Sequence, residues 1–132
     1  MDSRLIKRLE ILVEGDQLEA ELKEKIEILL KKFESDFELE LRNENAAMLV
    51  THLPMALMRI KRGEEVEDLD EMILLELKKE NFYSDCMDFI DHIETKTKIK
   101  IPAGEKNYLA LHFCNLIKQE SNTVRCQEQN KK

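Results

Sequence analysis

The sequence predicts an all-α fold, a compact bundle of five helices within one domain, and three observations support it. Only three glycines and two prolines interrupt 132 residues, so few positions break a helix. Leu, Ile, Glu and Lys are abundant, and all but Ile rank among the better helix formers. Charged residues make up 37% of the chain, above the roughly 25% of ordinary globular proteins. We expect a short helix over residues 1–15, a helical domain over 16–120 and a flexible tail over 121–132.

The N-terminal third is expected to hold two helices. The first is the short helix over residues 1–15. Asp16 then serves as the N-cap of the second helix, with Glu19 as its reciprocal capping partner. The apolar stripe of the second helix advances in steps of four and three and closes near Ser35; it consists of Leu18, Leu22, Ile26, Leu29 and Phe33. Residues 37–41 alternate with period two, but a single strand has nothing to pair with, so we interpret them as a connector or an extension into the next helix.

The middle of the chain predicts a third helix from about Asn43 to Lys61. Pro54 lies inside this helix and is expected to kink it, because proline offers no N–H to the carbonyl of Val50. The segment 63–68 that follows is acidic and polar, which is typical of a linker.

The C-terminal half predicts three more helices. The first begins at Leu69 and ends near Asn81, the next covers about 83–97, and the last begins after Pro102 and ends near Glu120. Residues beyond Glu120 are polar and show no periodicity, which predicts the flexible tail. Five of the expected helices are substantial, and these make up the predicted bundle.

Composition excludes several classes of function. The formal net charge of −7 predicts no direct nucleic-acid partner, because nucleic-acid-binding domains usually present a basic face. The basic cluster Arg59, Lys61 and Arg62 is interpreted as a solvated helix end. No apolar run approaches the roughly 20 residues of a membrane-spanning helix, so no membrane association is expected. Three widely spaced cysteines fit reduced thiols and a cytoplasmic protein.

The usual catalytic and cofactor motifs are missing from the sequence. It has no glycine-rich phosphate loop, no H-E-x-x-H, no G-x-S-x-G and no zinc-site spacing of cysteine and histidine. His112 and Cys114 are two residues apart on a helix, so they point to different sides. We therefore expect no enzyme activity, no cofactor and no metal site.

Two histidines are the main candidates for function. His52 lies mid-helix, with Arg59 on the same helical face. His112 lies in the last helix with Tyr108 four residues and Glu105 seven residues before it, and such a carboxylate could orient one ring N–H and leave the other nitrogen with a free lone pair. The alternative is that both are hydrogen-bonded rim residues without a function. His92, near Asp88 and Asp91, is interpreted as an ordinary exposed histidine.

Two segments resemble the histidine motifs of the phosphotransferase-system regulation domain, the PRD. The first is Thr51–Gly63, THLPMALMRIKRG, and the second combines Ile93-Glu94 with Ile99–Phe113, IKIPAGEKNYLALHF. In the family pattern of the second motif, an apolar residue and proline precede a short acidic turn, a glutamate, an aromatic residue and then A-L-H. The order and separation of the motifs also match, and the resemblance covers roughly residues 16–120.

The resemblance implies a dimeric five-helix domain of the kind found in bacterial antiterminators and transcriptional activators. It also implies that His52 and His112 accept phosphate from the histidine phosphocarrier protein or a sugar-specific transport component, with Arg59, Glu105 and Tyr108 as supporting residues. A phosphoryl group adds about −1.5 to −2 charges, enough to repel a subunit or recruit an arginine. We expect a stand-alone PRD that acts in transcriptional or metabolic regulation through an unknown protein effector.

Two other hypotheses stay open at this point. One is a helical adaptor that keeps the PRD fold and binds a partner without phosphorylation. The other is a small enzyme in which His112 and Glu105 form an acid–base pair, which requires a concave pocket around them. The sequence does not decide which histidine is modified, whether phosphorylation activates or inhibits, or which sugar or pathway is sensed.

Overall fold

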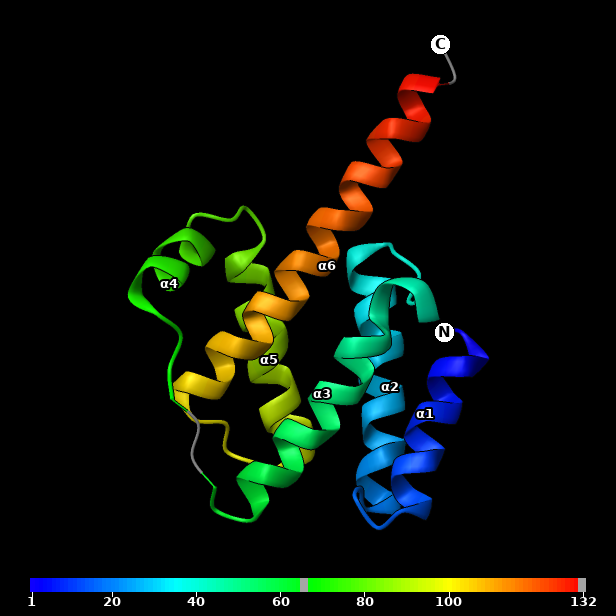
Figure 1. Cartoon of the computed structure of the whole chain (residues 1–132), viewed down its shortest axis with the longest axis vertical. Coiled ribbons are helices and arrows are strands. Elements are labelled where there is room, and N and C mark those ends of the chain that lie inside the picture. The colour runs from blue at the N-terminus through cyan, green and yellow to red at the C-terminus, as the bar shows by residue number, and fades with distance from the viewer. Residues whose placement is uncertain (65–66, 131–132) are drawn as a thin grey trace.

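The computed structural model describes the backbone of residues 1–64 and 67–130 and the side chains of residues 1–64 and 67–120. This part of the chain is all-α, as predicted, but it contains six helices (Figure 1) rather than five: α1 Ser3–Glu14, α2 Ala20–Phe37, α3 Asn43–Lys61, α4 Glu71–Lys78, α5 Tyr83–Thr97 and α6 Ala103–Asn130. The count of five was wrong because it set the N-terminal helix apart from the bundle. In the structure that helix belongs to the core, where Leu5 and Leu9 are completely buried.

Helix α1 is held against α3 by apolar contacts and by Asp2. One carboxylate oxygen of Asp2 caps α1 by accepting from the backbone N–H of Arg4, and the other accepts from the backbone N–H of Asn43 at the start of α3. The Asp2 backbone N–H also donates to the carbonyl of Leu41. Hydrogen bonds from the Arg4 side chain and from these backbone groups hold the pKa of Asp2 well below its usual range. Asp2 therefore joins the beginnings of α1 and α3.

The start of α2 differs from the prediction. The helix begins at Ala20 after Glu19, whose side chain makes no capping hydrogen bond, and Asp16 is not an N-cap. Asp16 instead lies in the left-handed region with φ of 59° and belongs to the turn after α1. Its N–H donates to the carbonyl of Val13, which ends α1. A loop from Gly15 to Glu19 thus occupies the expected first turn of the helix.

Helix α3 has the predicted bounds and continues through Pro54, which is buried. Gly63 follows with φ of 76°, a conformation that glycine adopts without strain. Asp68, at the end of the acidic linker, is fixed by two hydrogen bonds, from the backbone N–H of Leu69 and from the side-chain amide of buried Asn107 on α6. The linker is therefore tied to α6 immediately before α4.

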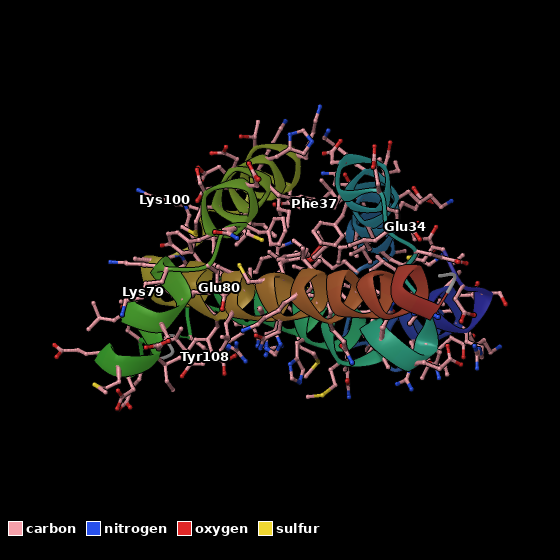
Figure 2. The ribbon with its side chains drawn as sticks, turned by 90° about the horizontal axis from the view of Figure 1, so that it is seen from above. Glu34, Phe37, Lys79, Glu80, Lys100 and Tyr108 are labelled. Atoms are coloured by element: carbon pink, nitrogen blue, oxygen red, sulfur yellow. The ribbon has the colours of Figure 1, made fainter. Side chains whose placement is uncertain are left out.

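The centre of the core lies where α2, α5 and α6 meet. Phe33, Phe89 and Phe113 form an aromatic cluster with ring centroids 4.8–5.4 Å apart. Figure 2 shows Phe37, which extends this cluster, between α2 and α5. Each of the three helices supplies one ring of the triangle, so these contacts fix the position of α6, which carries the second motif.

Helix α6 continues to Asn130, ten residues past the predicted end at Glu120. The predicted tail is therefore helical up to Asn130, and residues 131–132 lie outside the described part. Of the stretch 37–41, Phe37 is the last residue of α2, and residues 39–41 form a connector rather than a strand. Within the described residues, no helix combines the length and apolar character needed to cross a membrane.

Candidate functional site

The two histidine motifs lie on α3 and α6, which pack side by side in opposite directions (Figure 1). His52 faces His112, and Arg59 faces Glu105. Moving seven residues forward along α3 corresponds to moving seven residues back along α6. The two contacts are therefore about 10.5 Å apart along the helix axes, from a rise of 1.5 Å per residue. We call this line of polar contacts the α3–α6 seam.

The two predicted phosphoacceptors are in direct contact. Nδ1 of His52 lies 3.3 Å from Nε2 of His112, and the ring planes are inclined at 71°. His52 is exposed, whereas His112 is half-buried. The distance allows one hydrogen bond in which one nitrogen carries the proton and the other accepts it. Residues sixty positions apart in the sequence thus form one site.

Burial and the neighbouring His52 lower the pKa of His112. His112 is therefore neutral at physiological pH and can offer a lone pair at Nε2. When His52 donates Nδ1–H to this lone pair, the contact favours the His52 tautomer that is protonated on Nδ1. In that tautomer, Nε2 of the exposed His52 carries a free lone pair. The seam can in this way present a nucleophilic nitrogen at the surface.

Arg59 and Glu105 form the second contact of the seam. The guanidinium donates three hydrogen bonds of 3.0–3.1 Å to the two carboxylate oxygens of Glu105. The side chain of Glu105 is only 3% exposed, and that of Arg59 is 33% exposed. Arg59 lies in the last turn of α3 and Glu105 in the first turn of α6. Each side chain therefore carries a charge opposite in sign to the partial charge at its own helix end, which is a favourable arrangement. This ion pair fixes how the two helices align.

The structure gives Glu105 a different partner from the one that the sequence suggested. Glu105 was expected to orient the ring of His112, but both of its oxygens accept from Arg59, and His112 contacts His52 instead. The suggested acid–base pair of His112 and Glu105 is therefore not formed. The spacing of seven residues placed them correctly on one face of α6, but only the packing of α3 shows which side chain each one meets.

Tyr108, the remaining predicted supporting residue, is half-buried and packs against the core. Figure 2 shows it on the opposite side of α6 from Phe37. Among the described residues, no hydrogen bond joins Tyr108 to His112. Tyr108 therefore contributes to this region only by packing against the core, one helical turn before His112.

One contact of the seam involves residues that no sequence motif had indicated. Glu120 accepts hydrogen bonds from the Arg42 guanidinium at 2.9 Å and from the Asn45 side-chain amide at 2.8 Å. Asn45 also accepts from the backbone N–H of Arg42 and so caps the start of α3. Glu120 lies eight residues after His112, close to the seven-residue step from Glu105 to His112, but this spacing identifies a partner only when the register of the two helices is known.

The cysteines fulfil the prediction of free thiols where they are described. Cys86 on α5 and Cys114 on α6 are unbridged and buried, with their Sγ atoms 3.4 Å apart. The hydrogen bond with Cys114, together with burial, raises the pKa of the Cys86 thiol. Among the described residues, no group of three or more histidine, cysteine or acidic side chains is arranged to hold a metal ion.

Comparison with known proteins identifies the family to which this chain belongs. The model of the PRD domain matches residues 27–116, which include both histidine motifs, the later part of α2, all of α3 to α5 and the first half of α6. The chain belongs to the PRD domain family. The resemblance predicted from the two motifs is thereby confirmed.

A relative of this PRD chain occurs in Escherichia coli (strain K12), under the name "Uncharacterized protein YhfY". The two are 27% identical over 109 residues, which cover 83% of this chain and 91% of the relative. No solved structure matches the chain. The PRD match begins within α2, so α1, which buries Leu5 and Leu9, lies outside the matched region.

Proposed function

We propose that this PRD chain is a regulatory receiver that accepts a phosphoryl group on His52 and transmits the change to a partner protein. One observation carries the proposal. The two motif histidines meet at 3.3 Å, with His52 exposed and His112 half-buried, so that one ring faces a donor while the other supports it from behind.

The chemistry follows from the proton positions in the pair. With Nδ1–H of His52 donated to Nε2 of His112, the lone pair on Nε2 of His52 attacks the phosphorus of a donor phosphohistidine. A new N–P bond forms on His52, the N–P bond of the donor breaks, and the donor ring keeps that electron pair. His112 is a positioning residue in this step, since it holds the tautomer and orientation of the nucleophile.

A protein donor needs a surface around His52 on which to dock. Met48 and Met55 lie four residues before and three residues after His52, so all three share one face of α3. Their exposed fractions are 65% and 38%, which is high for large apolar side chains. Flexible methionines of this kind adapt to protein surfaces. The arrangement supports a protein donor, for which the histidine phosphocarrier or a sugar-specific transport component is our candidate.

The expected output is indirect. The phosphoryl group adds about −1.5 to −2 charges to a chain whose net charge is already −7. Such a change at an exposed helix face would alter the contact with a second copy of the chain or with a protein effector. We therefore propose a cytoplasmic, homodimeric regulator that is not an enzyme, does not bind nucleic acid directly, and acts in transcriptional or metabolic regulation.

Phosphorylation with purified components tests the proposal. The full chain is incubated with phosphoenolpyruvate, the general phosphotransferase enzyme and the phosphocarrier. We expect an acid-labile phosphate on His52 that is lost in His52→Ala, forms more slowly in His112→Gln and is unchanged in His92→Ala. No label on the wild-type chain, or an equal label on His52→Ala, would disprove the assignment.

A second candidate function is that of a protein adaptor, and α4 is the observation that favours it. Met72, Ile73 and Leu75 on this short helix are 45–72% exposed. The groove between α4 and α6 beside them is lined by Met72, Ile73, Glu76, Leu77, Glu80, Leu111, Asn115 and Lys118. If the double variant His52→Ala/His112→Ala binds its partner as the wild type does, and Met72→Lys does not, the adaptor function is favoured.

A further inference from the structure

We infer that His52 and His112 also form a two-ligand site for a divalent transition-metal ion of the zinc type, at the rim between α3 and α6. Neutral imidazoles are good ligands for zinc, copper and nickel. The site uses the nitrogens that face each other, Nδ1 of His52 and Nε2 of His112. It goes beyond phosphorylation, because it gives the pair a ligand of its own.

The distance between the two nitrogens fits one tetrahedral ion. Bonds from zinc to histidine nitrogen are about 2.0–2.1 Å long, and two such bonds ending on nitrogens 3.3 Å apart enclose an angle of roughly 104–111°. This range includes the tetrahedral angle. An ion therefore fits the pair with little movement of either helix.

The orientation of the rings supports the same arrangement. The ring centroids are 5.0 Å apart and the nitrogens 3.3 Å, a difference of 1.7 Å. This difference is less than the full width of an imidazole ring, so the nitrogens do not point straight at each other. At least one ring is therefore tilted away from the line that joins the two nitrogens, and a shared ion requires such a tilt of both rings.

The surroundings leave room for the rest of the coordination shell. His52 is exposed, so water can complete the remaining positions on the solvent side. The nearest charged pair along the seam, Arg59 with Glu105, is neutral as a unit. The net charge of −7 also attracts cations to the molecule as a whole.

Metal binding has a consequence that rests on the proposed function. The metal needs a lone pair on Nδ1 of His52, so the proton that Nδ1 shares with His112 moves to Nε2 of the same ring. Nε2 then no longer offers the lone pair that attacks phosphorus. Bound metal and phosphoryl transfer to His52 are therefore mutually exclusive.

Calorimetric titration of the full chain with Zn²⁺ at pH 7.5, without any phosphate donor, tests the site. We expect one ion per chain and no binding of Mg²⁺, which prefers oxygen ligands. Changes in residues that merely support a metal ligand cost about 10–100-fold in affinity, so His52→Ala and His112→Gln should each weaken Zn²⁺ binding at least tenfold. His92→Ala is the matched control and should bind as the wild type does.

Two outcomes would overturn the inference. One is wild-type Zn²⁺ affinity in both seam variants, and the other is loss of binding in Cys86→Ser alone, which would place the ion on the thiols. Circular dichroism confirms folding, and His52→Ala is the safer variant since its side chain is exposed.

Because no donor is present, a chain that is never phosphorylated can still bind Zn²⁺, and the two proposals fail separately. Phosphorylation of the chain should be slower in excess Zn²⁺ if bound metal and phosphoryl transfer to His52 exclude each other.

Discussion

At the scale of single residues, the chemistry of His112 depends on what covers it. The ring is half-buried between two helices and faces a second histidine, and both effects disfavour its charged form. A neutral His112 can accept the proton of His52, whereas a charged one cannot. The role of His112 in the proposed transfer therefore depends on its burial.

The lowered pKa of His112 predicts a pH dependence of stability. The unfolded chain binds a proton at the ordinary histidine pKa of about 6.5, and the folded chain binds it only at lower pH. The free energy of unfolding should therefore fall as pH drops from about 6.5 towards the lower pKa of His112 in the folded chain. Above about pH 6.5, His112 should make no contribution to the slope of stability against pH. Urea unfolding between about pH 7.5 and 5.5 measures it. His112→Gln should flatten the curve relative to wild type, and His92→Gln should not.

Arg59→Ala should destabilise the chain by about 3 kcal/mol. The variant leaves the carboxylate of Glu105, 3% exposed, without its partner, and breaking a buried ion pair costs about 3–5 kcal/mol. We expect the low end because Arg59 is one-third exposed. Urea unfolding measures the loss. Arg62→Ala is the control, since the partner of Arg62 among the described side chains is the exposed Glu64, and a loss as large as that of Arg59→Ala would contradict the explanation.

At the scale of helices, the exposed face of α3 separates docking from folding. Met48, His52 and Met55 occupy the solvent side, whereas Leu49, Leu53 and Leu57 of the same helix are buried. One helix thus supplies a core stripe and, on its opposite side, a candidate surface for the phosphate donor.

Met48→Lys should slow phosphoryl transfer to His52 without changing the free energy of unfolding by more than about 0.5 kcal/mol, as is usual for surface changes. The reason is that Met48 is 65% exposed and lies one turn from the acceptor. Transfer rates at several donor concentrations distinguish weaker docking from slower chemistry. Ile28→Lys, at an equally exposed position on α2, should leave the rate unchanged; an equal effect of both substitutions would point to overall charge instead.

At the scale of the whole molecule, α1 is part of the PRD structure although the family match begins after it. Leu5 and Leu9 are fully buried, and Asp2 ties α1 to the start of α3, the helix that carries His52. The fold that positions the histidine pair therefore extends beyond the matched region.

Leu9→Ala should cost about 2–5 kcal/mol, the range for buried leucine truncations, whereas Ile11→Ala, two residues on and 54% exposed, should cost less than about 0.5 kcal/mol. Urea unfolding of the two variants gives the comparison. Equal, small effects would show that α1 does not belong to the cooperative core.

Local sequence patterns were enough to predict the all-α class, the bounds of α3 and α5, and the two motifs with His52 and His112. Helical spacing and the scarcity of breakers are local signals, and local hydrogen bonds largely decide where a helix forms. The packing of α1 and the partners of Glu105, His112 and Glu120 were decided only by the tertiary structure. The contacts of Glu105, His112 and Glu120 join residues 46–78 positions apart, and they depend on the register of α3 against α6. That register is fixed by how the whole core packs, so no pattern within one helix contains it.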